Sequence, residues 1–117
     1  LSLHDALPIS EMPARVTVTT GLIKNAPFDW PMVVTEDELM IVVSEDSLDL
    51  AAASASEAMT NLVMRSLGLS FEDALILCSL AMDLRISQVV DPKKTVRAVM
   101  PLALLPWEKA AAALAEK

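Results

Sequence analysis

The sequence predicts an α/β protein of the α+β type: a mixed sheet of about five strands packed by two helices, plus a C-terminal tail helix. Two patterns predict this class. Apolar residues recur at helical spacing over residues 48–67, and they alternate with polar residues over 15–23 and again over 84–87. Residues 74–82 are almost wholly apolar, and at about nine residues they are too short to cross a bilayer, so they predict a helix buried on all sides.

The first expected strand covers residues 15–23, where Val16 and Val18 alternate with threonines and Gly21 marks a bulge or turn. Residues 24–31 contain prolines, Asn and Asp and are expected to form a loop. Trp30 in this loop either faces a substrate or packs at the edge of the core, and packing is the commoner use of such a residue.

A hairpin is expected next, with strands at residues 32–35 and 38–44 joined by an acidic turn. The three consecutive acidic residues at its tip are Glu36, Asp37 and Glu38. They could be metal ligands, but neighbouring side chains on a strand point to opposite faces, which favours a solvated hairpin tip.

The following helix is expected at residues 48–67. Asp46 or Ser47 can cap its first turn, and Gly68 provides the residue that helices favour just after their last turn. The apolar stripe of this helix is rich in alanine, which allows it to lie close against a sheet.

The second helix is expected to begin after Ser70, with Asp73 three residues on as a variant of the capping box. Leu77 is expected to face the core, and Cys78 to be a small core residue. One cysteine cannot form an internal disulfide, which is consistent with a cytoplasmic protein.

The remaining chain is expected to form two strands and a final helix. The first strand begins after Asp83, with Leu84 and Ile86, and stops at Asp91 and Pro92, because proline donates no hydrogen bond to a sheet. The second strand covers residues 95–100. Residues 101–106 are expected to be an extended exit, and residues 107–117 form the tail helix.

The composition argues against several functional classes. The formal net charge is −7, whereas nucleic acids and anionic membranes require clustered Lys and Arg, so neither partner is expected. Two glycines cannot provide a dinucleotide-binding fingerprint. The sequence also has no Cys/His spacing typical of a metal site.

Residues 1–9, LSLHDALPI, are interpreted as a translated sequencing adapter, because the adapter DNA CTT TCC CTA CAC GAC GCT CTT CCG ATC encodes them codon for codon. They are therefore not expected to belong to the fold. The single histidine, His4, lies in this segment, so the rest of the chain has no histidine to serve as a ligand or general base. A Ser–His or Cys–His nucleophile pair is excluded for the same reason.

The segment DLRISQVVDP, residues 83–92, follows a capped apolar helix and resembles the C-terminal end of the acetamidase/formamidase family. Shorter pieces that resemble the family occur in the same order: TTG at 19–21, SLDLA at 47–51, LGLS at 67–70, and Arg97 ahead of Pro101. Family members are much longer than this chain. The resemblance therefore implies that residues 10–106 are the C-terminal portion of a larger β-rich enzyme.

The resemblance also implies an activity, which is hydrolysis of the C–N bond of linear amides such as acetamide and formamide to a carboxylate and ammonia. A divalent metal, Zn²⁺ or Ca²⁺, is implied for the full-length enzyme. The implied parent is a cytoplasmic homo-oligomer acting on a small aliphatic amide. Because the ligands and most catalytic groups would lie upstream, this fragment is expected to bind no metal or cofactor and to be inactive alone.

Asp83, Arg85 and Gln88 are the candidate catalytic residues, because binding sites are commonly built where elements end. Asp83 and Arg85 could instead tie the helix end to the sheet, and we favour that role. Gln88 could hydrogen-bond an amide substrate or satisfy neighbouring backbone groups. The alternative function is a small acidic, non-enzymatic module that binds a protein partner through its sheet edge or a helix face.

Overall fold

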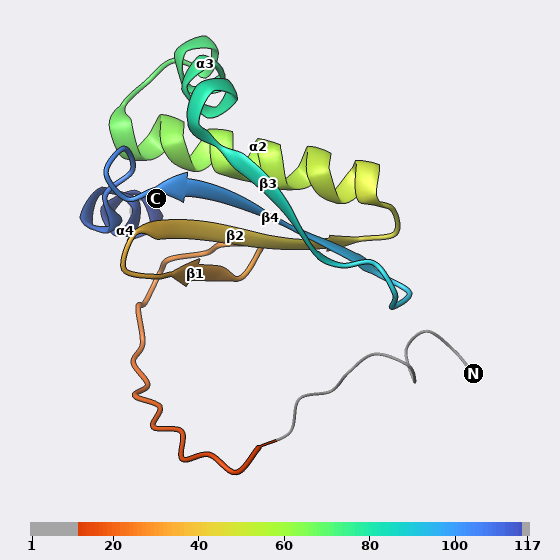
Figure 1. Ribbon diagram of the computed structural model, residues 1–117. Helices are drawn as coiled ribbons and strands as arrows, with labels where there is room; N and C mark the ends of the chain where they lie inside the picture. Colours follow the sequence, from red (N-terminus) through yellow and green to blue (C-terminus); the bar gives the residue numbers. More distant parts are fainter. Residues whose placement is uncertain (1–11, 116–117) are drawn as a thin grey trace.

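The computed structural model describes residues 12–115, which form one four-stranded sheet and three helices (Figure 1). The elements are, in order, β1 (Met32–Val34), β2 (Glu38–Glu45), α2 (Leu48–Leu67), α3 (Phe71–Ala81), β3 (Asp83–Gln88), β4 (Lys94–Pro101) and α4 (Trp107–Ala115). The α/β class is confirmed. The described part has four strands instead of about five, and every strand pair is antiparallel, so the sheet is not mixed.

Residues 1–9 lie outside the described part of the chain, so their interpretation as adapter-derived stays a prediction. The same holds for the division into residues 10–106 and 107–117. Among residues 12–115, no helix combines the length and the apolar character that crossing a membrane requires.

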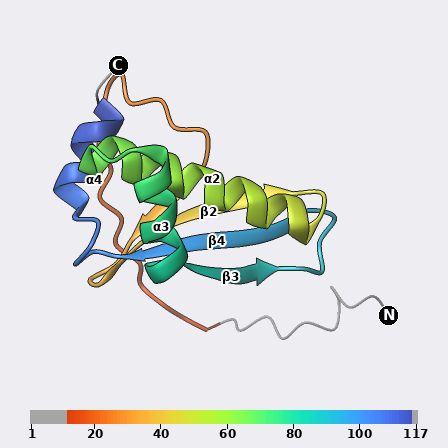
Figure 2. The ribbon, with the colours of Figure 1, turned by 90° about the horizontal axis from the view of Figure 1, so that it is seen from above.

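The sheet has the order β1-β2-β4-β3, and β4 is central although it follows the other strands in sequence. Alternate residues of β2 and β4 pair across the ladder and point to the same face, where α2 covers them. These pairs are Leu39 with Met100, Ile41 with Ala98, and Val43 with Val96, and all are buried. They form the centre of the core, and Figure 2 shows α2 running alongside β2 and β4.

Helix α2 has the predicted bounds and the predicted caps. The Oγ of Ser47 accepts a hydrogen bond from the amide of Leu50 at 3.1 Å, and Gly68 has φ of 65°, a left-handed conformation that glycine adopts at little cost. Ala51 and Ala55 are fully buried, so the expectation that small residues bring this helix close to the sheet agrees with the structure.

Helix α3 is capped as predicted, since the Oγ of Ser70 accepts from the amide of Asp73 at 3.2 Å. The prediction that it is buried on all sides is wrong. Ala74 and Cys78 are buried and Leu77 packs against the core, but Leu80 is 81% exposed. The helix packs against α2 with one face, and no other described element covers the opposite face.

The strand expected at residues 15–23 is absent from the described structure. The segment is exposed throughout and Val16 is 78% exposed. Alternating side chains indicate a segment suited to a sheet, but a strand exists only where a neighbour supplies hydrogen bonds. This segment pairs with neither β1 nor β3, the two edges of the sheet.

Residues 101–106 form a tight turn, so the expected extended exit is wrong. The amides of Leu104 and Leu105 both donate to the carbonyl of Pro101 at 3.0 Å. This turn directs the chain back so that α4 packs against α2, burying Ala110 and Leu114. Helix α4 is therefore part of the core, which stabilises an otherwise marginal short helix.

Candidate functional site

A charged cluster occupies the face of the sheet opposite α2. Arg85 on β3 donates from Nη1 to Oε1 of Glu38 at 3.0 Å and from Nη2 to Oε2 at 2.7 Å, a bidentate pair that joins β3 to β2 across β4. The same guanidinium donates to Oδ2 of Asp83 at 3.1 Å. Asp83 and Arg85 are therefore brought together as predicted, and Arg85 also binds Glu38, which the sequence places at the hairpin tip.

The guanidinium arm crosses the central strand. Val99 on β4 pairs with Asp83 of β3 on one side and with Met40 of β2 on the other. Arg85 lies two residues from Asp83 along β3, and Glu38 lies two residues from Met40 along β2, in the opposite direction along the sheet. The line between the two charged groups therefore passes over Val99. This path explains why Val99 is only 2% exposed on a face that no helix covers.

The charges of the cluster are stabilised in their ordinary forms. The hydrogen bond from Arg85 holds the pKa of Glu38 below its usual 4.5, although partial desolvation opposes the shift. The same bond, together with that to Asp83, raises the pKa of Arg85. A carboxylate held ionised by a bidentate arginine is a poor general acid or base near neutral pH, so the arrangement acts as a structural tie.

Gln88 lies at the opposite end of β3 from Asp83. Its Oε1 accepts from the amides of Val89 at 3.1 Å and Val90 at 3.0 Å, immediately after an irregularity in the β3–β4 ladder. Of the two alternatives left open by the sequence, the structure supports the one in which Gln88 satisfies neighbouring backbone groups.

The three acidic residues at the hairpin tip do not converge. Glu36 and Asp37 are exposed, as expected for a solvated tip, whereas Glu38 turns to Arg85. Within residues 12–115, no group of three or more His, Cys, Asp or Glu side chains is placed to hold a metal ion. Glu38 and Asp83 both bind Arg85, so these two carboxylates do not fit a divalent metal.

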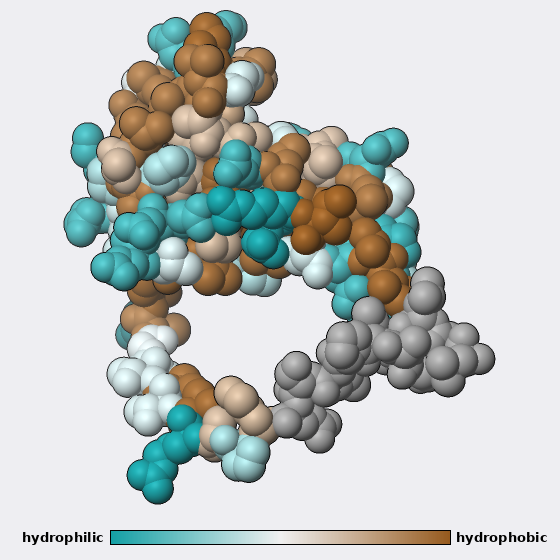
Figure 3. Space-filling view, in the orientation of Figure 1, coloured by the Kyte–Doolittle hydropathy of each residue, from teal (hydrophilic) through white to brown (hydrophobic). Residues whose placement is uncertain are grey.

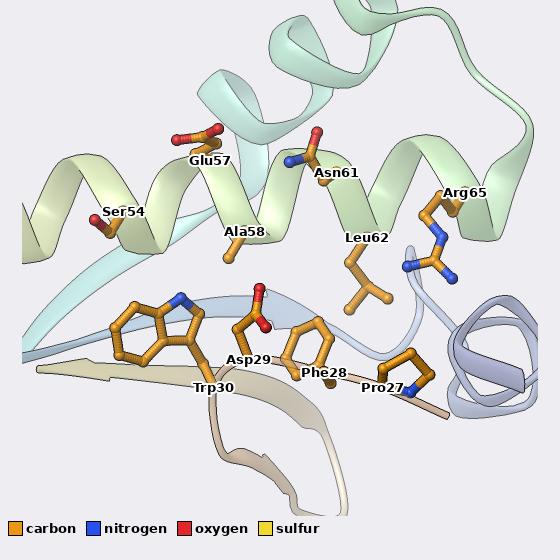
Figure 4. A pocket seen from close by; sticks show the side chains of 10 residues that line it. All are labelled: Pro27, Phe28, Asp29, Trp30, Ser54, Glu57, Ala58, Asn61, Leu62 and Arg65. Atoms are coloured by element: carbon orange, nitrogen blue, oxygen red, sulfur yellow. The ribbon is translucent and has the colours of Figure 1, made fainter. Parts of the chain in front are cut away.

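A cavity of about 320 Å³ lies between α2 and the loop that precedes β1 (Figure 4). Trp30 and Phe28 form its loop side, and the carboxylate of Asp29 points between them toward the helix. Trp30 also packs against the core. The structure supports the packing alternative for this residue, and a substrate-facing role stays a prediction.

The helix side of the cavity comes from a polar stripe on α2, which sequence reasoning missed. Ser54, Glu57, Asn61 and Arg65 follow one another at spacings of three or four residues, so they share one face of the helix. This spacing is visible in the sequence and is the signal from which the polar stripe could have been predicted. The cavity joins aromatic rings to side chains of both charges, which suits a small polar group, but its open position does not exclude water.

The cysteine is a structural residue. Cys78 is buried, burial raises the pKa of its thiol, and a hydrogen bond with Thr60 opposes the shift only in part. The thiol therefore stays protonated near neutral pH, and the expectation of a small core residue is confirmed.

Three solved structures are similar to this chain. An acetamidase from Bacillus halodurans is 36% identical with a TM-score of 0.62, and the match covers 64% of this chain and 25% of the acetamidase chain. A recombinant predicted acetamidase/formamidase from Thermoanaerobacter tengcongensis is 36% identical with a TM-score of 0.61, and the match covers 63% of this chain and 25% of that one. An acetamidase from Yersinia enterocolitica is 30% identical with a TM-score of 0.67, and the match covers 71% of this chain and 25% of that one.

The chain therefore spans about a quarter of the length of the solved structures it matches. It matches no protein-family model and no curated protein. The resemblance to the acetamidase/formamidase family, inferred from DLRISQVVDP and the shorter pieces, is confirmed by these structures.

Proposed function

We propose that this chain is the C-terminal portion of an amidohydrolase that cleaves linear amides such as acetamide or formamide, and that it is inactive alone. The observation that carries the proposal is the 30–36% identity to structures named as acetamidases or as an acetamidase/formamidase. Identity of this size over a matching fold supports a common chemistry in the parent protein, although fold alone would not.

The role of this chain in that enzyme is to support the site rather than to supply its reacting groups. The carboxylates of Glu38 and Asp83 are already bound by Arg85, and the thiol of Cys78 is buried. We assign the divalent metal, Zn²⁺ or Ca²⁺, and the groups that activate water to the remainder of the polypeptide. Asp83, Arg85 and Gln88 hold the helix end, the sheet and the turn in place.

The proposal includes a small aliphatic amide as substrate, a homo-oligomeric parent and a cytoplasmic location. The substrate follows from the matched structures' names, and the location from the single cysteine, which cannot form an internal disulfide. The comparisons give no support to the alternative of a non-enzymatic interaction module.

The test replaces the matched segment of the Bacillus halodurans acetamidase with residues 12–115 of this chain. Ammonia release from acetamide and formamide is measured with Zn²⁺, with Ca²⁺ and without added metal. We expect the chimera to hydrolyse at least one amide and the full chain alone to hydrolyse neither. Metal-dependent turnover by the full chain alone would contradict the proposed division of roles.

A matched variant separates catalysis from support. In the chimera, Arg85→Gln should lower the midpoint of thermal unfolding and leave kcat close to the unsubstituted chimera, because the guanidinium binds Glu38 and Asp83 rather than a reacting atom. A loss of kcat of about a hundredfold, the usual size of a direct catalytic contribution, with an unchanged unfolding midpoint would instead make Arg85 a catalytic residue.

A further inference from the structure

Helix α3 and strand β3 expose a set of large aliphatic side chains. We call the outward residues Ile76, Leu80, Leu84 and Ile86 the α3–β3 face; each is between 45% and 81% exposed. Figure 3 shows hydrophobic side chains gathered over α3, above a hydrophilic band that crosses the sheet. Exposed apolar side chains that occur singly need no explanation, but a group carried by two consecutive elements indicates a contact surface.

The strand in this group is an open edge. Strand β3 pairs with β4 alone, so one side of its backbone has no partner strand among the described residues. By register, Leu84 lies opposite Ala98 and Ile86 opposite Val96, on the sheet face that α2 covers at the centre. At the edge that cover is missing, which leaves the two side chains exposed. The other edge strand, β1, has only three residues and is a poorer template for pairing.

The other flank of α3 is also incompletely filled. Phe71 and Leu75 border a groove of about 240 Å³ between α3 and α2, whose opposite wall includes Thr60 and Asn61. Helix α3 thus contacts the molecule along a narrow line, and both of its sides lie open.

We propose that the α3–β3 face is buried by the part of an acetamidase-type polypeptide that this chain does not match, which adds a strand to the open edge of β3 and covers the four aliphatic side chains. The inference rests on the proposed function and deepens it by locating the contact. The matched structures are covered over only 25% of their length, so about three quarters of such a polypeptide lies outside this unit and is available to cover it. An open strand edge beside exposed Leu and Ile fits strand addition.

A second copy of the chain is a less suitable occupant. Each copy has a formal net charge of −7, so two copies repel one another. A covalently continuous polypeptide has no such barrier, because the contact is intramolecular and its effective concentration is high.

The test co-expresses the full chain with a tagged Bacillus halodurans acetamidase polypeptide that lacks the matched segment, and it measures co-purification. We expect the unsubstituted chain to co-purify. Leu80→Lys and Leu84→Lys should each reduce recovery about tenfold or more, as for a charge placed in an interface core. The control is Val33→Lys on β1, because Val33 and Leu84 are both 45% exposed and lie on opposite edges of the sheet. It should leave recovery unchanged.

Two further measurements complete the test. In the full chain alone, both lysine variants should keep the unsubstituted midpoint of thermal unfolding, and sedimentation should show a monomer. In the complex, backbone amides of β3 should exchange with deuterium more slowly than in the chain alone. Failure of the unsubstituted chain to co-purify, equal loss with Val33→Lys, or a dimer that the lysine variants dissociate would each overturn the proposal. A complex that forms but has no amidase activity would overturn the proposed function and leave the contact surface intact.

Discussion

Helices α2 and α3 are built by the same local rules and are buried to very different extents. Each follows a serine whose hydroxyl accepts from the amide three residues on, and each has acidic residues in its first turn. Yet α2 places a continuous row of buried residues against the sheet and α4, whereas α3 buries Ala74 and Cys78 alone, although its sequence is more apolar. Local sequence decides where a helix forms, but its burial depends on what packs against it.

The largest effect should come from the buried row of α2. Met59 on α2 is fully buried in the core, so Met59→Ala should lower the free energy of unfolding by about 2–5 kcal/mol, the usual cost of a large-to-small change in a core. Urea unfolding followed by circular dichroism measures this loss. A cost below about 1 kcal/mol would mean that α2 is no better packed than α3.

The caps should matter equally in the two helices. Ser47→Ala and Ser70→Ala should each cost about 1 kcal/mol, because each removes one hydrogen bond to a first-turn amide. Ser→Asp at the same positions provides a control that restores an acceptor. If only the Ser47 change lowered the stability, the contribution of a cap would depend on how well its helix is buried, and the two helices would not follow the same local rules.

A smaller, pH-dependent difference is expected at the start of α2, where Asp46 forms an ion pair with Lys93 of the turn before β4. The hydrogen bond from Lys93 lowers the pKa of Asp46 below its usual 3.8. A lowered pKa in the folded state means that the stabilisation is present above the unfolded-state value and is lost as the pH falls through the folded-state value. Asp46→Asn should therefore be less stable than the unsubstituted chain at neutral pH, and the difference should disappear as the pH falls through the folded-state pKa of Asp46. A difference that persists at acidic pH would show that the ion pair is not its cause.

The smallest effect is expected at the outer side of α3. Leu80→Ala should change the free energy of unfolding of the full chain by less than about 0.5 kcal/mol, since Leu80 loses almost no buried area. Thermal unfolding of the two proteins, compared with Leu77→Ala as the half-buried partner on the same helix, gives the measurement. A cost at Leu80 equal to that at Leu77 would show that the outer side of α3 is covered in solution.

The sequence located the elements well where local chemistry determines them. The bounds of α2, the caps Ser47 and Ser70, the hairpin of β1 and β2, and the strands β3 and β4 follow from periodicity, capping residues and turn residues. Residues 15–23 failed as a strand because pairing is not a local property, and residues 101–106 failed because their turn is set by two amides converging on Pro101.

The site was less predictable than the fold. Asp83 and Arg85 were selected because they stand where a helix becomes a strand, and the structure does join them. Glu38 completes the cluster from a strand 47 residues away, and only the order β2-β4-β3 brings it within reach of Arg85. The cavity beside Trp30 likewise depends on a loop that folds back onto the polar stripe of α2, a contact between distant parts of the chain.

The central position of β4 has a consequence for the order in which the fold can form. Of the four described strands β4 is synthesised last, yet it separates β2 from β3 and pairs with both. Until it is made, β3 has no partner, α2 has no complete sheet to cover, and the charged pair of Glu38 and Arg85 has no strand to span. Closure of the sheet therefore waits for contacts of long sequence separation, which slows folding, and the apolar side chains of α3 and β3 stay exposed to other nascent chains during that interval.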